Sequence, residues 1–394
     1  MNILFYSYMK PVPTSGGIER VTDIIALGLS KYSHKCFVLY DKDVVGTCND
    51  CFISSSLIPT KERIAFIKNY LCKNEIDIVV VQGRRDVLSS FKQCINGLSI
   101  KLVYVLHSDP GYGFDTFNVD TLKYEILHTS GFLRLHKLFI LALYPLYKLR
   151  CKKILKLSYQ QAYSIVDKFI LLSDAAVPYF IKLANITDVS KISVINNPMT
   201  YDKILPITEY SKKEKIVLIV SRMEEHSKKL SLALKAWKKI ERDKSMNQWI
   251  LEIVGDGEDL NAYKQWVVKN GLRRVRFYGT QVPDKFYKKS SIFLMTSKSE
   301  AWGMTIIEAQ QQMCVPVAFN SYCAIKDIIQ HKRNGLLVDY PSVNDFSSSI
   351  CELASNYELR KRMAFNGRSS TKAFSHRLII KKWNSLLNKT ISNQ

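Results

Sequence analysis

The chain has 394 residues, of which 47% are hydrophobic, so it can bury large cores, and nothing in this composition suggests global disorder. Its 57 Lys and Arg residues against 35 Asp and Glu residues give a formal net charge of +22. This charge attracts anionic partners, such as nucleotide phosphates, nucleic acid or an anionic membrane face, but does not choose among them. The length predicts two domains.

The apolar segments limit how the chain meets a membrane. Met1–Tyr6 enters a strand-like run at once, without the charged region, apolar stretch and cleavage site of a signal peptide. No apolar run reaches the roughly 18 to 20 residues that a spanning helix requires. We therefore expect a cytoplasmic protein without a membrane-spanning helix.

The nine cysteines are odd in number and scattered along the chain, which predicts reduced thiols rather than a disulfide framework. Cys48 and Cys51 are the one close pair. A zinc site would need a second pair at similar spacing, which the sequence lacks, so we expect no metal there.

Short apolar runs alternate with helical patterns along the whole chain, as in parallel sheets covered by helices. The first half has six such runs and the second half six more: 3–6, 36–40, 78–81, 102–106, 169–172 and 192–195, then 216–220, 250–254, 275–278, 292–295, 315–319 and 336–338. The aperiodic stretch 197–213 predicts a connection between two doubly wound α/β domains, residues 1–198 and 199–394. The last helical pattern, Leu378–Leu387, stays in the second domain or crosses back to the first.

Two features of the first half follow strand-like runs. The loop after the first run ends in Gly16 and Gly17, whose backbone can approach a phosphate or a sugar closely. It matches neither the phosphate-loop pattern nor the dinucleotide pattern of three spaced glycines. His107 directly follows the run 102–106, at a strand end where an imidazole favours ligand contact over packing.

The segment 131–160 combines seven Lys or Arg residues, no acidic residue and an apolar stretch with aromatic edges. This pattern favours contact with anionic lipid. The alternative is a helix pair packed within the first domain, with the Lys and Arg stems covering apolar surface.

In the second half, Arg222 follows the run 216–220, and Lys228 stands just before a helical pattern. An Arg fork and a Lys point charge on neighbouring strand-end turns suit a diphosphate. Gly255 and Gly257 close the next run, and turn formation is the first interpretation of both glycines.

The most informative segment runs from Glu300 to Glu308 and places two carboxylates around Gly303, Met304 and Thr305 at a predicted helix start. A strand, a glycine turn and a helix start form an anion-binding geometry, and the carboxylates can accept hydrogen bonds from sugar hydroxyls. The alternative is a capping box of Thr305 and Glu308.

Together these residues resemble the retaining glycosyltransferases of family 4, which have the GT-B fold of two Rossmann-like domains facing each other across a cleft. The resemblance covers nearly the whole chain and depends on the order of Gly16-Gly17, His107, Asn197-Pro198, Ser221-Arg222 with Lys228, Gly255-Asp256-Gly257, and Glu300 through Glu308. Two departures occur: one extra residue lies between Arg222 and Lys228, and 321–324 replaces a frequent Gly-Gly turn.

The resemblance implies roles for these residues. Residues 1–198 would bind the acceptor, with His107 approaching the transferred sugar, and residues 199–394 would bind the nucleotide sugar. Arg222 and Lys228 would neutralise the donor diphosphate, with backbone donors from Gly16, Gly17, Gly303, Met304 and Thr305. Glu300 would contact the transferred sugar and Glu308 the ribose. No cofactor and no metal are expected.

We therefore expect transfer of a hexose-type sugar, with retention, from a UDP- or GDP-sugar to a lipid-linked glycan acceptor, in capsule, O-antigen or similar surface polysaccharide synthesis. The enzyme would lie peripherally on the inner face of an anionic cell membrane and bind no nucleic acid. The alternatives are a sugar-nucleotide 2-epimerase of the same fold, a catalytically silent scaffold, and a basic nucleic-acid-binding protein, for which no recognised motif occurs.

Overall fold

The computed structural model describes residues 1–12, 16–44, 46, 52–56, 62–127 and 129–392. These residues form two compact units. Unit 1 comprises residues 1–198 and 374–394, and unit 2 comprises residues 199–373. The Cys48 and Cys51 pair lies outside the described residues, and the cysteines within them carry free thiols.

Unit 1 contains a seven-stranded parallel sheet with the strand order β3-β2-β1-β4-β5-β6-β7. Its central strands are buried on both faces, which explains their nearly continuous apolar sequences, such as the fully buried β4. The strands are β1 (Asn2–Met9), β2 (Lys35–Lys42), β3 (Phe52–Ser56), β4 (Ile78–Gln82), β5 (Lys101–Val105), β6 (Lys168–Leu171) and β7 (Ile192–Val194).

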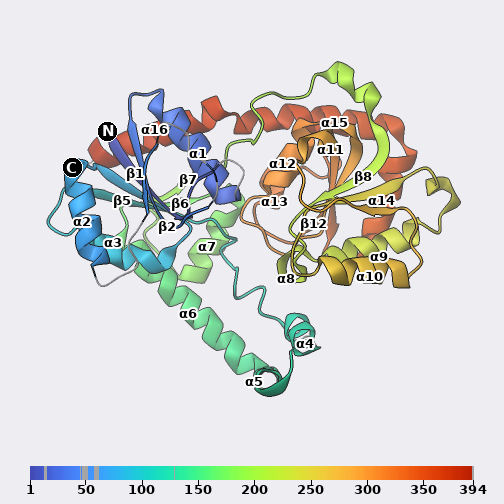
Figure 1. Ribbon diagram of the computed structural model, residues 1–394, viewed down its shortest axis with the longest axis horizontal. Helices are drawn as coiled ribbons and strands as arrows, with labels where there is room; N and C mark the ends of the chain where they lie inside the picture. Colours follow the sequence, from blue (N-terminus) through green and yellow to red (C-terminus); the bar gives the residue numbers. More distant parts are fainter. Residues whose placement is uncertain (13–15, 45, 47–51, 57–61, 128, 393–394) are drawn as a thin grey trace. The chain divides into compact units, whose positions relative to one another are not determined.

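The helices of unit 1, apart from α16, lie between these strands in the chain, and α1 packs against β1 and β2 (Figure 1). They are α1 (Gly17–Ser30), α2 (Arg63–Lys73), α3 (Leu88–Cys94), α4 (Val119–Leu127), α5 (Gly131–Ala142), α6 (Tyr144–Ile165), α7 (Val177–Ala184) and α16 (His376–Ser392), with short 3-10 turns η1 (Arg85–Val87) and η2 (Asp174–Ala176).

Helices α5 and α6 differ from the rest of unit 1. None of the residues of α5 is buried, and the buried residues of α6 all fall in its second half, from Leu155 onward. Figure 1 shows α6 running away from the sheet, with α5 at its far end. We call residues 131–154 the basic arm. The arm is packed in part, because α5 contacts α4 and α6, but many of its apolar side chains, among them Phe132, Leu135 and Phe139, lie exposed.

Helix α16 comes from the end of the chain but packs against α1 of unit 1. The contact is close: a Cβ added at Gly28 would lie 2.3 Å from a side-chain carbon of Ile380. His34 Nε2 and Asn384 Oδ1 lie 2.7 Å apart and join the same helix to the start of β2. The final helix therefore crosses back, and unit 1 is built from two separate stretches of sequence.

Unit 2 contains a six-stranded parallel sheet with the order β10-β9-β8-β11-β12-β13. Its core is one cluster around Trp237, Val217 and Phe346. The strands are β8 (Glu214–Val220), β9 (Ile250–Val254), β10 (Val275–Phe277), β11 (Ser290–Met295), β12 (Val315–Asn320) and β13 (Leu336–Asp339).

The helices of unit 2 follow the same alternation along the chain. They are α8 (Glu225–Lys228), α9 (Leu230–Ile240), α10 (Leu260–Lys269), α11 (Asp284–Lys289), α12 (Met304–Gln311), α13 (Ile325–Ile328), α14 (Val343–Ser355) and α15 (Tyr357–Ser370), with 3-10 turns η3 (Ile207–Lys212) and η4 (Lys244–Met246); η5 (Thr371–Phe374) leads out of the unit.

Both sheets reverse their strand order once. In unit 1 the reversal lies between β1 and β4, and in unit 2 it lies between β8 and β11. Open parallel sheets bind ligands at the carboxyl ends of the strands beside such a reversal. The segments after these four strands are therefore where each unit presents a ligand site.

Candidate functional site

The segment after β8 is held against the segment after β9 by two glycines. A Cβ at Gly255, where φ is +131°, would lie 1.9 Å from the carbonyl oxygen of Ser221. A Cβ at Gly257 would lie 2.5 Å from the carbonyl oxygen of Met223, whose N–H donates to Asp256 O at 2.9 Å. The interpretation of these glycines as turn residues agrees with this geometry. Their function is to let the backbone that carries Arg222 pack closely on its neighbour.

Lys228 and Glu300 meet at the carboxyl edge of the unit 2 sheet. Lys228 Nζ lies 2.5 Å from Glu300 Oε1, with side-chain exposures of 15% and 18%. Ser297 Oγ donates to the same carboxylate oxygen at 2.7 Å. Two hydrogen bonds tie the loop of α8 to the end of β11: Thr296 Oγ1 to Lys228 O at 2.9 Å, and Lys298 N to Ser227 O at 2.7 Å. The sequence placed both residues at this edge, and the structure joins them directly.

Arg222 occupies the same edge in a different way. Its side chain is 77% exposed, and the nearest carboxylate oxygen, Glu224 Oε2, is 3.9 Å away. A pair this loose and exposed contributes little to stability. The guanidinium is therefore an exposed cation at this edge, accessible to an anion.

The amino end of α12 follows Glu300 by a few residues. Gly303 is its N-cap, with φ +104°, and no side chain caps the helix. The capping box of Thr305 and Glu308 is wrong, because the N-cap is Gly303, two residues before Thr305, and no side chain caps the helix. The N–H groups at the start of such a helix, including those of Met304 and Thr305, are available to an anion, and the helix dipole favours one there.

The segment 321–324 replaces an expected glycine turn and packs against this helix start. A Cβ at Gly303 would lie 2.6 Å from the Tyr322 hydroxyl, and Ser321 Oγ donates to Ser297 O at 2.6 Å. A tyrosine thus fills the space beside the glycine. Sequence reasoning missed this role for Tyr322, because nothing local marks a tyrosine that contacts a glycine 19 residues earlier.

Glu308 lies behind the edge. It is 2% exposed and accepts hydrogen bonds from Thr200 Oγ1 at 2.6 Å and from Tyr287 Oη at 3.0 Å. Burial and the neighbouring carboxylate raise the pKa of Tyr287 well above its ordinary value, so its hydroxyl stays a donor. The structure gives Glu308 these interior partners, and its contact with a ribose stays a prediction.

In unit 1, Gly16 and Gly17 begin α1, which has no side-chain cap. A Cβ at Gly16 would lie 2.1 Å from a carboxylate oxygen of Glu19, whereas a Cβ at Gly17 would meet nothing within 4 Å. Burial raises the pKa of Glu19. The preceding loop residues 13–15 lie outside the described residues. A buried carboxylate therefore lies beside Gly16 at the helix start, and the approach of Gly16 and Gly17 to a ligand stays a prediction.

His107 directly follows Leu106 at the end of β5, as the sequence indicated. Its Nε2 lies 2.5 Å from Oε1 of Gln82, the last residue of β4. Burial lowers the pKa of His107 to about 4, so the imidazole is neutral near pH 7. A neutral ring bonded to a buried amide can orient a hydroxyl but carries no charge.

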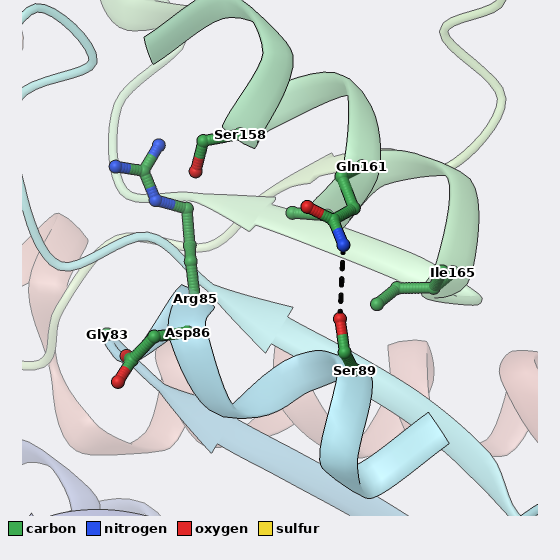
Figure 2. A pocket seen from close by; sticks show the side chains of 8 residues that line it. Gly83, Arg85, Asp86, Ser89, Ser158, Gln161 and Ile165 are labelled. Atoms are coloured by element: carbon green, nitrogen blue, oxygen red, sulfur yellow. Dashed lines mark hydrogen bonds between the residues drawn. The ribbon is translucent and has the colours of Figure 1, made fainter. Parts of the chain in front are cut away.

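A polar pocket beside these residues was missed by sequence reasoning. It has a volume of about 400 Å³ and lies between the segment after β4 and the second half of α6 (Figure 2). Its lining residues are Gly83, Arg85, Asp86, Ser89, Ser158, Gln161, Ala162 and Ile165. The available signal was the pair Arg84-Arg85 two residues after an apolar strand, where ligand-binding residues are expected.

Comparison with solved structures identifies the class of this architecture. The Anabaena protein HepE in complex with UDP matches 99% of this chain and all of its own, with a TM-score of 0.73 and 18% identity. The pneumococcal O-GlcNAc transferase in complex with UDP and GlcNAc matches 99% of both chains, with a TM-score of 0.74 and 12% identity. The fold is that of the GT-B glycosyltransferases, as the sequence predicted.

The sequence comparisons concern mainly unit 2. Residues 201–370 match the family model described as glycosyl transferases group 1. An amylovoran biosynthesis glycosyltransferase of Erwinia amylovora is 27% identical over 233 residues, covering 57% of this chain and 63% of the relative. A poly(ribitol-phosphate) alpha-N-acetylglucosaminyltransferase of Staphylococcus aureus is 27% identical over 210 residues, covering 52% and 41%. These matches span less than two thirds of each relative.

Proposed function

We propose that this protein is a retaining glycosyltransferase that moves a hexose-type sugar from a UDP- or GDP-sugar to a glycan acceptor. The acceptor is lipid-linked, and the product belongs to a surface polysaccharide such as a capsule, an O-antigen or another part of a lipopolysaccharide. The relatives named for amylovoran biosynthesis and for poly(ribitol-phosphate) support an acceptor that belongs to a polymer. The solved GT-B structures with UDP support a nucleotide-sugar donor.

The observation that carries the proposal is the Lys228 and Glu300 ion pair at the strand-order reversal of unit 2. An ammonium beside a carboxylate offers two chemistries at one point. The cation compensates the charge that develops on a departing diphosphate, and the carboxylate accepts hydrogen bonds from sugar hydroxyls. Arg222 and the start of α12 add further positive potential at the same edge.

The mechanism is electrostatic. As the bond between the sugar and the diphosphate breaks, negative charge grows on the diphosphate oxygens, and Lys228, Arg222 and the N–H groups of Met304 and Thr305 stabilise it. We propose that these groups serve in place of a metal ion. Glu300 holds the sugar. The acceptor hydroxyl attacks the anomeric carbon from the face that the diphosphate leaves, and its proton passes to the departing diphosphate oxygen, so that the anomeric configuration is retained. His107 orients that hydroxyl as a neutral hydrogen-bonding group.

The test of the donor site begins with thermal-shift titration of UDP, GDP, ADP and their sugars, followed by transfer assays with the base that binds. Lys228→Met is expected to lower kcat by about 10² to 10³, the loss typical of removing one preorganised donor to a developing charge. Lys235→Met, an exposed lysine on α9, is the matched control and keeps full activity. Turnover in Lys228→Met above a tenth of the parent would contradict the assigned role.

Two further measurements check the chemistry. Proton NMR of the first product formed gives its anomeric configuration, which should equal that of the donor. Activity should persist in excess EDTA, because the side chains and helix end supply the positive charge. Inversion of the anomer would refute the retaining mechanism. Loss of activity in EDTA that Mg²⁺ restores would refute the metal-independent mechanism.

A third measurement separates a transferase from a 2-epimerase. A transferase releases free nucleoside diphosphate only upon acceptor addition.

We further propose that the basic arm binds an anionic membrane, peripherally and on its cytoplasmic face. Its apolar side chains are exposed, with Phe132 at 83%, Leu135 at 65% and Phe139 at 56%. Segment 131–160 contains Arg134, Lys137, Lys148, Arg150, Lys152, Lys153 and Lys156 but no acidic residue. Exposed apolar side chains interleaved with cations match the chemistry of an anionic lipid surface, in which the apolar groups insert and the cations contact headgroups.

The helices themselves limit how the arm meets lipid. Among the helices in the described ranges, none combines the length and the apolar character needed to cross a bilayer. Binding in the plane of the membrane is therefore the mode that we propose for the arm. The exposure of the arm fits this mode, because none of the residues of α5 is buried.

The membrane proposal is tested by co-sedimentation with vesicles of phosphatidylcholine alone or mixed with phosphatidylglycerol. The parent protein should bind the mixed vesicles and lose binding at high salt, because salt screens the attraction between the exposed cations of the arm and the anionic headgroups. The double variant Phe132→Ser with Phe139→Ser should lose binding, whereas Val268→Ser with Val282→Ser, two exposed apolar residues of unit 2, should not. Equal vesicle binding by both double variants would refute the role of the arm in membrane binding. An oligomer in solution that dissociates when Phe132 and Phe139 are substituted would also refute it, because the exposed apolar residues would then contact another copy of the protein.

A further inference from the structure

The polar pocket of unit 1 has the chemistry of an oxyanion site. Arg85 comes from the 3-10 turn η1 after β4, and Figure 2 shows its side chain extending toward α6, on the side of Ser158. Its guanidinium carbon lies 4.0 Å from the centre of the Tyr159 ring. The ring is fixed in turn, because Tyr159 Oη donates to Pro110 O at 2.8 Å. The stacking holds the planar fork of the arginine in one place beside the pocket.

Among the described residues, no carboxylate forms an ion pair with Arg85. Its Nη1 is buried and has no hydrogen-bond partner among the described residues. The carboxylate beside it in sequence, Asp86, is occupied by Arg84, whose Nε and Nη2 donate to its two oxygens at 2.7 and 2.5 Å. That pairing holds the pKa of Asp86 below its ordinary value, so the carboxylate stays charged and paired with Arg84. Figure 2 shows Asp86 turned away from the Arg85 guanidinium.

The remaining lining groups are suited to hydroxyls. Gln161 Nε2 donates to Ser89 Oγ at 3.2 Å, which joins α6 to α3 across the pocket. The hydroxyls of Ser89 and Ser158 and the oxygen of the Gln161 amide offer donors and acceptors of the kind that bind polyols. Only Ala162 and Ile165 add apolar side chains. Arg85 beside neutral hydroxyl and amide groups, with the Asp86 carboxylate already paired to Arg84, fits an oxyanion attached to a hydroxyl-rich molecule.

The position of the pocket connects it to the proposed reaction. Gly83, with φ +78°, directly follows β4 at the strand-order reversal of unit 1. A Cβ placed there would lie 3.5 Å from Cβ of His107. One lining residue of the pocket, Gly83, is therefore a neighbour of the residue that is proposed to orient the acceptor hydroxyl.

We infer that this pocket binds the phosphate or carboxylate of an anionic glycan or polyol acceptor, with Arg85 contacting the oxyanion and Ser89, Ser158 and Gln161 contacting neighbouring hydroxyls. This inference rests on the proposed function, because it names the class of acceptor that the same enzyme takes. It makes Arg85 a specificity-determining residue that acts on the acceptor and not on the donor.

The test compares charged ligands with neutral partners of the same shape, by calorimetric titration of the full-length protein. Glycerol 3-phosphate is compared with glycerol, and glucuronate with glucose. At least one charged member should bind tenfold or more tightly than its neutral partner, and the pair that responds identifies the oxyanion. Equal affinity within both pairs overturns the inference.

Variants then locate the binding. Arg85→Gln should weaken binding of the charged ligand at least tenfold, and Gln161→Ala, on an exposed part of α6, should weaken it to a smaller degree. Arg134→Gln on the basic arm is the control and should bind as the parent does. If Arg85→Gln fails to fold, Ser158→Ala replaces it with the same expectation as Gln161→Ala. Parent-like affinity in both folded pocket variants overturns the site.

The donor response separates this inference from the proposed function. The thermal shift with nucleotide sugar should be the same in Arg85→Gln, Gln161→Ala and the parent. If nucleotide sugar binds and is transferred while no anionic acceptor is preferred, the inference about the pocket fails alone. If no nucleotide sugar binds to the parent, the proposed function fails, whatever the pocket binds.

Discussion

The carboxyl edges of the two sheets and the basic arm differ in how many of their side chains are bonded or packed within the protein itself. At the edges, Lys228 is bonded to Glu300 and His107 to Gln82, and Gly255 leaves no room for even a methyl group. On the arm, Phe132 is 83% exposed and α5 buries nothing. The fold thus fixes the geometry of the edges by itself, whereas the arm has a surface that only a partner can cover. The edges should be sensitive to substitution in isolation, and the arm only in the presence of lipid.

The largest expected effect is at the glycine-dependent edge of unit 2. Gly255→Ala should lower the free energy of unfolding by about 2 to 6 kcal/mol, since it combines backbone strain at positive φ with a clash against Ser221 O. Gly271→Ala is the matched control, because Gly271 also has positive φ but has nothing within 4 Å of an added Cβ. It should cost only about 1 to 2 kcal/mol. Equal losses in urea denaturation would show that the edge is less tightly packed than described.

The next effect depends on pH at the unit 1 edge. Burial lowers the pKa of His107 to about 4, so between pH 6.5 and 4 the unfolded chain binds a proton that the folded chain does not. Stability therefore falls as the pH drops through this range, with a contribution from His107 of up to about 3 kcal/mol. Denaturation at pH 7 and pH 5 should show a smaller difference in His107→Gln than in the parent. An unchanged difference would mean that the imidazole is solvated.

A smaller effect distinguishes the two roles of Glu308. Thr200→Val removes one interior donor to this carboxylate and should cost about 1 to 3 kcal/mol of stability, the usual cost of leaving a buried polar group without a partner. Glu308→Gln should cost a similar amount and, if the carboxylate also contacts ribose, should raise KM for the nucleotide sugar. Thr200→Val leaves that KM unchanged in either case. A parent-like KM in Glu308→Gln would assign Glu308 to the interior alone.

The smallest expected effect is on the arm. Phe132→Ser with Phe139→Ser should change the free energy of unfolding without lipid by no more than about 0.5 kcal/mol, as for exposed positions generally. By contrast, Phe169→Ala in the core of the same unit should cost about 3 to 5 kcal/mol. A loss above about 1 kcal/mol in the arm variant would show that the arm packs on its own chain, and the comparison with the edges would then fail.

Much of the fold could be predicted because both sheets are parallel and buried. Such strands have continuous apolar runs, and all twelve predicted runs coincide with strands, as with Ile78–Val81 in β4. The missed strand is β3, Phe52–Ser56, which lies at the sheet edge and contains three serines. An edge strand needs no continuous apolar run, so its hydrogen bonds to β2 left no signal in the hydropathy.

The candidate site could be predicted in part for a similar reason. Residues directly after apolar runs, such as Arg222 and His107, fall at the carboxyl edges by topology alone. The pairing of Lys228 with Glu300 joins residues 72 apart, and the sequence gives no measure of that distance. The burial of the Glu308 side chain could not be predicted either, because it depends on hydrogen bonds with Thr200 and Tyr287, which lie 108 and 21 residues away in the chain.

The return of α16 to α1 has a consequence for how the protein is made. Translation delivers the whole of unit 2 before the last helix of unit 1 leaves the ribosome. Until then, the groove on α1 that receives Ile380 is uncovered, together with the other sites for the buried face of α16. Unit 1 therefore completes its folding last, although its synthesis begins first, and a fragment ending at residue 198 would expose the same apolar surface permanently.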